Sequence, residues 1–236
     1  MKSFVALAAV AGSIGLSSLA NAAVIFTAGT ETGSRYNPQA NAALPGGFTA
    51  ANTIAFTSCV FTGSNTSVIL DRLTFGIRQL GGAPTVDARV FVAQMTGDGT
   101  LDSSSVQDLG LLSVGAASAS ATTLVSLNLS GLKLSMTDLA PANNPGLSGF
   151  YVGLRFEGAN AASNLNGWRI TNAPSLGLAF NNFAAYDPTT ASLDYFAFPA
   201  PTPSYMYVNV DGTLVPAPGA LALLGLAGVA GSRRRR

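Results

Sequence analysis

Apolar and polar residues alternate with a period of two along most of the chain between residues 23 and 215. In Phe150–Glu157 and Val86–Val92 every second residue is apolar, and in Ile69–Arg78 the residues Ile69, Leu73, Phe75 and Ile77 share one face. Successive side chains of a strand point to opposite faces, so this spacing predicts half-buried β-strands. Further strands are expected at Val24–Thr27, Thr53–Phe61, Thr122–Leu129, Leu132–Met136, Trp168–Thr171, Leu176–Phe180, Asp194–Phe198 and Tyr205–Val210.

Clusters of glycine, asparagine, aspartate and proline separate these segments, as in Gly97-Asp98-Gly99 and Asn143-Asn144-Pro145-Gly146. Such clusters are typical of tight turns, and no segment between them has a helical stripe. The pattern predicts an all-β fold in which two antiparallel sheets form a jelly-roll-like β-sandwich of about ten to twelve strands. The last strand is expected to end at Asp211-Gly212, which would leave Val215–Pro218 extended and unpaired beyond the fold.

The first 22 residues have the composition of a secretory signal peptide. Lys2 precedes an apolar run from Phe4 to Leu19, and Ala20-Asn21-Ala22 supplies the small residues of a cleavage site. This order predicts removal by signal peptidase, with Ala20 and Ala22 at the recognised positions. An uncut membrane anchor is the alternative, and the glycines and serine that interrupt the apolar run disfavour it.

The C-terminal tail has three parts. Pro216-Ala217-Pro218 comes first, Gly219–Ser232 carries no charge, and Arg233, Arg234, Arg235 and Arg236 end the chain. As a helix, residues 217–232 would span about 24 Å, less than the roughly 30 Å of a bilayer's hydrocarbon core. Flanking arginines stay on the cytoplasmic side. The tail therefore predicts a hydrophobic helix inserted transiently in the inner membrane, with the body outside.

Val215 to Arg236 resembles a PEP-CTERM sorting signal, although Ala217 replaces the central glutamate of that family. The resemblance implies a bacterial protein cut near the proline motif by an exosortase, an inner-membrane cysteine protease. Release or transfer to the cell surface would follow. The family's usual association with extracellular polysaccharide implies a matrix role. Three segments are thus expected: a signal peptide at 1-22, a β-sandwich domain at 23-214 and the sorting tail at 215-236.

The composition excludes several classes of catalytic site, metal site and cross-link. The chain has no histidine and a single cysteine, which excludes serine–histidine triads, zinc–histidine sites and intrachain disulfides. Lys2 and the terminal arginines account for much of the basic charge, so the body is mildly acidic and no nucleic-acid partner is expected. Cys59 lies in an apolar run and is expected to be buried.

Glycoside hydrolysis remains conceivable without histidine, because it requires only two carboxylates. Glu157 beside Arg155, and Asp87 beside Arg89, are more typical of surface ion pairs than of catalytic acids. No acid–base motif is present, so an enzyme is not expected. The candidate carbohydrate contacts are Tyr186, Asp187, Asp194 and Tyr195, which flank one loop, and Trp168, which suits the core equally well.

Calcium is the one cofactor that the sequence suggests. Asp98, Thr100 and Asp102 place oxygen atoms at alternate positions, as a calcium loop does. Ser103 stands where an EF-hand requires glycine, so an ordinary hairpin turn is the competing interpretation.

The sequence thus predicts an exported, exosortase-processed, non-enzymatic surface or extracellular-matrix protein that contacts polysaccharide. The alternative is a lectin-like module or a glycoside hydrolase that uses the acids near 187–194.

Overall fold

The computed structural model describes residues 23–40, 47–80, 83–115, 122–139, 146–196 and 204–217. Ala20, Ala22, Pro218 and Arg233 to Arg236 lie outside these ranges, as does the expected C-terminal helix, so the predictions made for them stay predictions. Within the described ranges, no helix has the length and apolar character needed to cross a membrane.

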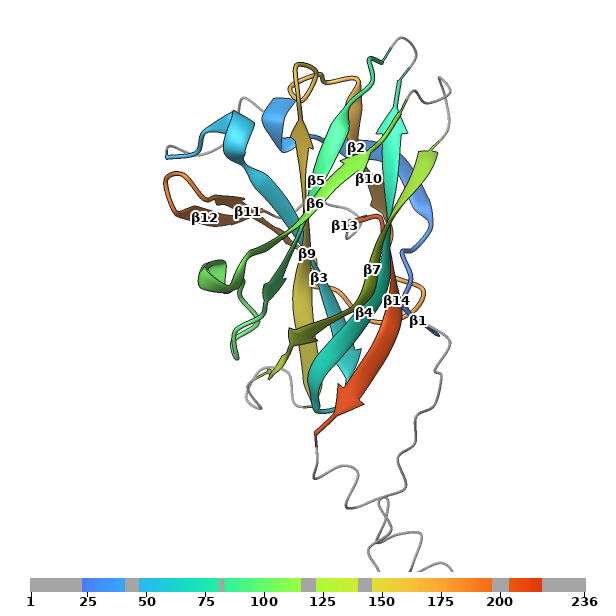
Figure 1. Ribbon diagram of the computed structural model, residues 1–236, viewed down its shortest axis with the longest axis vertical. Helices are drawn as coiled ribbons and strands as arrows, with labels where there is room; N and C mark the ends of the chain where they lie inside the picture. Colours follow the sequence, from blue (N-terminus) through green and yellow to red (C-terminus); the bar gives the residue numbers. More distant parts are fainter. Residues whose placement is uncertain are drawn as a thin grey trace, which may run out of the picture.

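Two antiparallel sheets lie face to face, which confirms the all-β sandwich (Figure 1). Sheet 1 has the order β1-β14-β4-β10-β13, and β2 and β7 pair additionally with β10 and β4. Its strands are β1 (Ala23–Phe26), β2 (Glu31–Tyr36), β4 (Asn65–Gln79), β7 (Thr122–Ser135), β10 (Asn166–Thr171), β13 (Tyr205–Met206) and β14 (Val208–Pro216).

Sheet 2 has the order β12-β11-β3-β9-β5-β6, and β8 pairs additionally with β9. Its strands are β3 (Ile54–Thr62), β5 (Asp87–Gln94), β6 (Gln107–Ser113), β8 (Thr137–Asp138), β9 (Leu147–Glu157), β11 (Phe183–Asp187) and β12 (Ser192–Phe196). Short 3-10 helices occur at η1 (Pro38–Ala40), η2 (Ala50–Asn52) and η3 (Ser103–Ser105).

The main core lies between the sheets and contains most of the apolar positions that the alternation predicted. Ile69 is an exception: the pairing of β4 with β14 skips Asp71, so Leu70 takes the core position and Ile69 is only half-buried. Phe75 of β4 and Trp168 of β10 have ring centroids 5.7 Å apart, and Phe61 stacks on Phe150 at 5.8 Å. Cys59 is buried in this core, as expected from its apolar run. Each large apolar side chain removed from water contributes about 1.5–3 kcal/mol, so this layer is the main source of stability.

A second apolar cluster covers the opposite face of sheet 2. Phe56 of β3, Phe91 of β5 and Tyr151 of β9 belong to it, and Tyr195 of β12 packs against it. The Phe56 ring occupies the space above Gly153, where a Cβ atom would lie 2.4 Å from a ring carbon. Sheet 2 is therefore buried on both faces, and almost every residue of β3 is inaccessible to solvent.

Several predicted strand limits were wrong. Thr122–Leu129 and all of Leu132–Met136 except Met136 belong to one strand, β7, which contains Ser130 and Gly131, both with positive φ. Residues 176–180 form no strand, and only Leu176 and Leu178 make isolated bridges. Strands β2, β6 and β11 were not anticipated, because β2 and β6 are rich in polar residues and β11 is short.

The last strand does not end at Asp211-Gly212. It continues to Pro216, with Val215 opposite Ser67, and the Ala217 N–H donates a hydrogen bond of 2.9 Å to the Ser64 carbonyl. The Asp-Gly pair makes no turn and stays in the ladder. The pairing skips Asp71 of β4, which forms a bulge there, and a glycine at 212 lets the Ile69 carbonyl oxygen approach to 2.2 Å from the position of a Cβ. The expectation that this part of the tail is unpaired was therefore wrong.

Candidate functional site

A pocket of about 500 Å³ opens on the outer side of sheet 2, where the turn after β5 meets the segment before β11 and strand β12. Figure 1 shows β12 and the turn after β5 on this side of the sandwich. We call it the Asp98–Tyr195 pocket, and its lining residues are Asp98, Gly99, Thr100, Phe180, Asn181, Asn182 and Tyr195.

Asp98 supplies the charge of this pocket. Its carboxylate accepts hydrogen bonds from the Thr96 hydroxyl, from the Thr100 hydroxyl at 2.8 Å and from the Thr100 N–H at 3.2 Å. The side-chain hydrogen bonds from Thr96 and Thr100 are the main reason that the pKa of Asp98 is lowered to about 2. The pocket therefore carries a fixed negative charge over the whole physiological pH range.

Two tyrosines hold the turn that carries Asp98 against sheet 2. The Tyr151 hydroxyl donates to the Gly99 carbonyl at 2.8 Å, and the Tyr195 hydroxyl accepts from the Leu101 N–H at 2.6 Å. Burial raises the pKa of both hydroxyl groups, so both stay protonated at neutral pH. The Phe180 ring packs against Gly99, which has a φ of 87° that favours glycine. The pocket wall is thus anchored by side chains of β9 and β12.

Carboxamides form the remaining wall. The Ser58 hydroxyl accepts a 2.8 Å hydrogen bond from the Phe180 N–H and so fixes this segment to β3. Asn181 Oδ1 accepts a hydrogen bond of 3.1 Å from the Ser204 N–H. Asn182 Oδ1 is buried and has no donor within reach in the described part of the chain. The wall therefore combines amide groups, an aromatic ring and one unsatisfied acceptor.

The pocket brings together residues that the sequence placed in two separate hypotheses. Tyr195 was a candidate sugar contact, whereas Asp98 and Thr100 were candidate calcium ligands. Phe180, Asn181 and Asn182 were not anticipated as site residues, because nothing local shows which distant turn they face. The Phe-Asn-Asn run was the only available signal, since it joins an aromatic ring to two carboxamides.

The other candidates from the 187–194 loop do not line this pocket. Asp187 is fully buried, and its carboxylate accepts from the Thr49 N–H at 2.6 Å and from the Thr189 hydroxyl at 2.6 Å. Burial raises the pKa of Asp187, but these hydrogen bonds outweigh it, and the net shift is downward. Tyr186 packs against the second apolar cluster, and Asp194 is exposed. Asp187 is therefore a structural turn residue, which corrects its assignment as a sugar contact.

Trp168 is not a sugar platform. Its side chain is fully buried between the sheets, and its Nε1–H donates to the Tyr207 carbonyl at 2.7 Å. Stacking on a sugar requires an exposed ring face, so the core interpretation of Trp168 was the correct one.

The three candidate calcium ligands each have hydrogen-bond partners within the chain, and Asp98 and Thr100 bond each other at 2.8 Å. Asp102 accepts hydrogen bonds from the Ser104 N–H at 3.0 Å and hydroxyl at 2.6 Å, and so caps η3, while Asp98 is bonded within its own turn. No cluster of three acidic or cysteine side chains suited to a metal ion occurs among the described residues. Calcium binding through Asp98, Thr100 and Asp102 stays a prediction.

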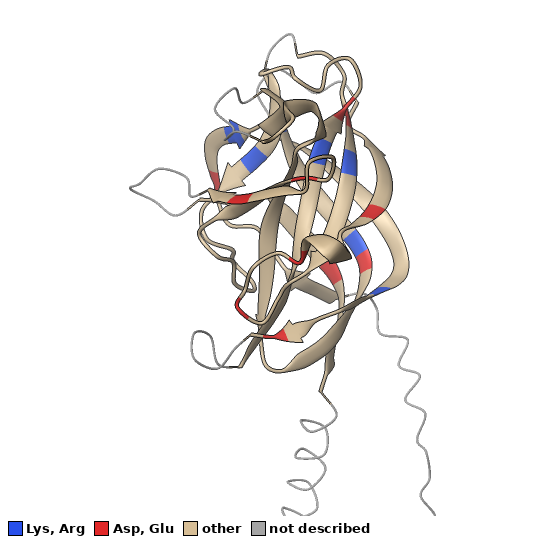
Figure 2. Cartoon of the chain, turned by 90° about the vertical axis from the view of Figure 1, so that its left-hand side faces the viewer, with Lys and Arg blue, Asp and Glu red and all other residues tan. Residues whose placement is uncertain are grey.

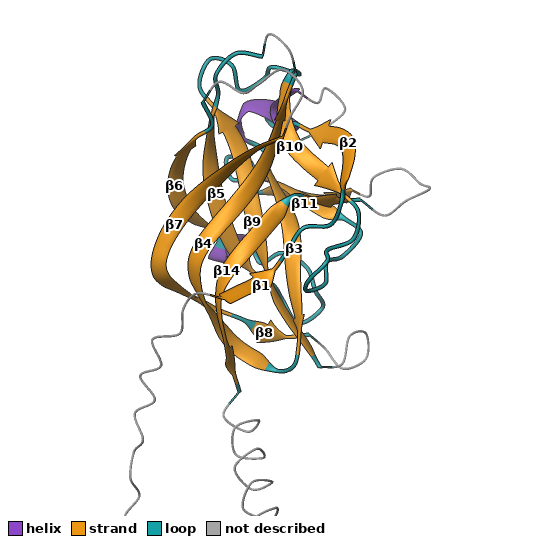
Figure 3. Cartoon of the chain, turned by 90° about the vertical axis from the view of Figure 1, so that its right-hand side faces the viewer, coloured by secondary structure: helices purple, strands orange, loops and turns teal. Residues whose placement is uncertain are grey.

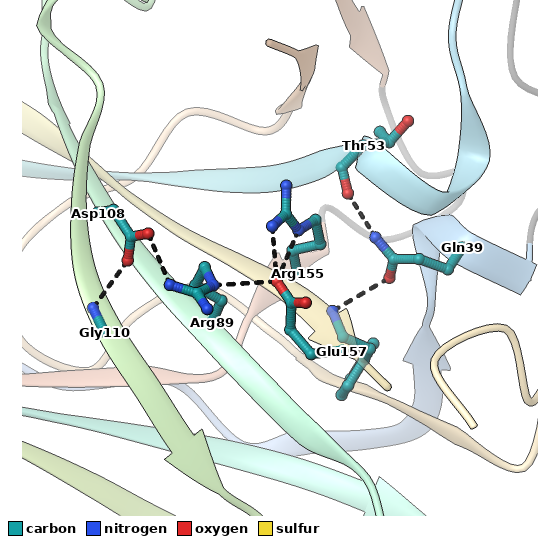
Figure 4. Close-up of polar contacts among 8 residues, drawn as sticks. Gln39, Thr53, Arg89, Asp108, Gly110, Arg155 and Glu157 are labelled. Atoms are coloured by element: carbon teal, nitrogen blue, oxygen red, sulfur yellow. Dashed lines mark hydrogen bonds and ion pairs between the residues drawn. The ribbon is translucent and has the colours of Figure 1, made fainter. Parts of the chain in front are cut away.

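A chain of ion pairs runs along the outer face of sheet 2, the face that carries the second apolar cluster, as Figure 4 shows. Arg89 bonds Asp108 at 2.8 Å and Glu157 at 3.1 Å, and Arg155 bonds Glu157 at 2.6 Å. Arg155 also lies 5.5 Å from the centre of the Phe91 ring. Glu157 therefore behaves as the paired surface carboxylate that the sequence indicated. Figure 2 shows the charged residues scattered along strands and turns that consist mostly of uncharged residues.

No protein family matches this chain, and no curated protein is similar to it. The chemistry of the pocket is therefore the main guide to function. It offers one carboxylate, two carboxamides, two hydroxyl groups and two aromatic rings around a space large enough for a small ligand.

Proposed function

We propose that this chain is an exported, non-enzymatic surface or extracellular-matrix protein that contacts polysaccharide through the Asp98–Tyr195 pocket. In this proposal signal peptidase removes the first 22 residues, an exosortase-type protease processes the tail, and the jelly-roll-like sandwich remains at the cell surface or is secreted. The pocket is the observation that carries the binding part of the proposal.

The groups in the pocket suit a sugar. A carboxylate and carboxamides exchange hydrogen bonds with hydroxyl groups, and the rings of Tyr195 and Phe180 offer apolar surface to the C–H face of a pyranose. The volume of about 500 Å³ lies within the usual range of small-molecule sites. Asp98 is held in place by Thr96 and Thr100, so its acceptor oxygen is already oriented before a ligand arrives.

Binding is favoured over hydrolysis by the number and state of the carboxylates. A glycosidase requires two of them, about 5 to 9.5 Å apart. Asp98 is the one carboxylate among the described residues that line the pocket, and its pKa of about 2 keeps it ionised. An ionised carboxylate cannot donate the proton that a leaving group needs.

The end of β14 is compatible with processing of the tail. Val215 and Pro216 pair with β4, and Ala217 bonds the turn that precedes β4, so a cut after Ala217 would leave every strand of sheet 1 in place. Intact-mass analysis of the protein from its native cells tests this part. We expect a product that lacks residues 1–22 and the terminal arginines, whereas a mature product that keeps Arg233–Arg236 would contradict processing.

A glycan array followed by titration calorimetry tests the binding part. We expect the wild-type sandwich to bind at least one oligosaccharide, and Asp98→Asn to weaken this affinity about tenfold, because a charged acceptor is lost. Asp194→Asn is the matched control, since Asp194 is an exposed acid next to Tyr195 that does not line the pocket. A wild-type protein that binds no glycan, or equal losses in both variants, would reject the pocket as a sugar site.

A further inference from the structure

Three arginines lie on the outer face of sheet 1, on the side of the molecule opposite the Asp98–Tyr195 pocket. Arg35 is on β2, Arg169 on β10 and Arg78 on β4, and these strands lie side by side in Figure 3. Arg169 is directly opposite Arg35 in the register, and Arg78 is opposite Gly167. Residues two apart on a strand share a face, so all three guanidinium groups belong to one patch, the arginine cluster.

Gly167 allows the arginines to approach one another. It has no side chain, and the stem of Arg35 lies across it, so that a Cβ at this position would be 2.9 Å from Arg35 Cγ. Arg35 therefore extends over β10 toward β4, where Arg78 stands. Burial lowers the pKa of Arg35, and the positive charge of Arg78 lowers it further, as expected for neighbouring cations.

The cluster has less negative charge than positive charge. Glu31 forms an ion pair of 2.9 Å with Arg169 Nη2, and it also accepts a hydrogen bond of 2.8 Å from the Thr122 hydroxyl. Arg35 donates to the Asn164 carbonyl, which is uncharged. In the described part of the chain, Glu31 is the one carboxylate that forms an ion pair with these three guanidinium groups.

Several N–H groups of the cluster have no acceptor. The Arg169 side chain is only 5% exposed, yet neither its Nε nor its Nη1 reaches an acceptor among the described residues. Arg78 Nε is also buried and has no acceptor among the described residues. Buried charged donors without acceptors are destabilising, so a group that supplied oxygen atoms here would be strongly favoured.

We propose that the arginine cluster binds an oxyanion, namely a carboxylate or sulfate group. The planar guanidinium matches the two oxygens of such a group, and the surplus of positive charge would compensate its negative charge. The Tyr207 ring lies over Gly76, the next outward position on β4, and adds an apolar wall that a sugar carrying the anion would contact. The site lies on a different sheet from the pocket and does not depend on the proposed function.

Titration with sodium sulfate, sodium glucuronate and neutral glucose, at constant ionic strength maintained with sodium chloride, tests this site. Both anions are expected to shift the arginine Nε–H resonances in proton–nitrogen spectra, and glucose is expected to leave them unchanged. Tighter binding of glucuronate than of sulfate would indicate the carboxylate of an acidic sugar, and equal binding would indicate any free oxyanion. If neither anion shifts these resonances, the site does not exist.

Variants identify the residues involved. Arg78→Gln is expected to weaken anion binding about tenfold, because one charge-assisted contact is lost. Arg72→Gln is the matched control: Arg72 is on the same strand, but it is 52% exposed and already paired with Asp211 at 2.5 Å. Arg169→Gln should abolish anion binding. If that variant does not fold, the comparison of Arg78→Gln with Arg72→Gln still shows whether binding depends on the arginine cluster. Equal losses in these two variants would show a non-specific charge effect and overturn the proposal.

Discussion

Hydrogen bonds from threonines lower the pKa of two carboxylates that lie in different surroundings, one at the surface and one in the interior. Asp98 is bonded by Thr96 and Thr100 at the surface, and Asp187 is bonded by Thr189 and the Thr49 N–H in the interior. Both hydrogen-bond sets favour the ionised form and lower the pKa, even at Asp187, where burial alone would raise it. Local hydrogen bonding therefore outweighs desolvation at this position.

Thr96→Val is expected to raise the pKa of Asp98 from about 2 toward the ordinary aspartate value, because the first of its stabilising hydrogen bonds is removed. A pH titration of the Asp98 carboxyl carbon by NMR measures this shift. Thr189→Val removes a comparable bond from Asp187 and should leave the Asp98 titration unchanged. An unchanged midpoint in Thr96→Val would show that Thr96 does not contribute.

Asp187→Asn is expected to lower the free energy of unfolding by about 1–3 kcal/mol at pH 7. A carboxamide has a single acceptor oxygen, whereas Asp187 accepts hydrogen bonds at both of its oxygens. The pKa of Asp187 is lower in the folded state, so its stabilising effect is complete above the ordinary aspartate pKa and is lost as the pH falls through the folded value. The difference between wild type and variant should therefore shrink in acid. Urea unfolding at several pH values measures it.

Asp194→Asn is the control for this comparison, because Asp194 lies on the partner strand of the same hairpin and is exposed. Its effect should stay within about 0.5 kcal/mol. A loss as large as that of Asp187→Asn would contradict the distinction between a buried and a solvated acid.

At the scale of elements, β14 shows how one residue changes the end of a strand. Gly212 permits a close approach of the Ile69 carbonyl, so the ladder with β4 shifts its register and then continues through Leu214 and Val215. The side chain of Leu214 packs against the main core. The folded part of the chain consequently extends to Ala217, the middle residue of the Pro-Ala-Pro motif.

A protein that ends at Thr213 is expected to be less stable than one that ends at Ala217 by about 1–3 kcal/mol. It loses the burial of Leu214 and the pairing of the last residues with β4. Urea unfolding of the chains 23–213 and 23–217 measures the difference. Equal unfolding midpoints would show that the last residues of β14 do not contribute to the fold.

The period-two pattern predicted those strands whose two faces differ, such as β7, because solvent on one side and core on the other select different residues. It could not set the limits of β14, because the Asp-Gly pair opposite the bulge of β4 has the same local signature as a turn. The pocket combines residues near 98, 180 and 195, and only the pairing of distant strands brings these segments together. Sequence reasoning thus found Asp98 and Tyr195 separately, but not their proximity.

At the scale of the whole molecule, the main core and the second cluster enclose sheet 2 from both sides. Cys59 lies on β3, inside this double cover, and is completely buried. Burial raises the pKa of its thiol, so the reactive thiolate is scarce in the folded protein. Access to this sulfur therefore requires disruption of the sandwich as a unit.

The Cys59 thiol is expected to resist an aromatic disulfide reagent in the native protein and to react at the rate of global unfolding. Absorbance of the released thiolate measures the reaction, with the same protein in concentrated urea as the positive control. Rapid labelling without denaturant, or an interchain disulfide on a non-reducing gel, would contradict the buried position.

The double cover of sheet 2 also bears on the energetics of recognition. Tyr151 belongs to the second cluster and Tyr195 packs against it. Each hydroxyl group forms a hydrogen bond with the backbone of the turn that carries Asp98 and so holds that turn in place. The pocket wall is thus preorganised, and few of its side chains would lose conformational entropy when a ligand binds. The affinity of that ligand would depend on the quality of its own contacts, and complex formation would leave the backbone of the protein nearly unmoved.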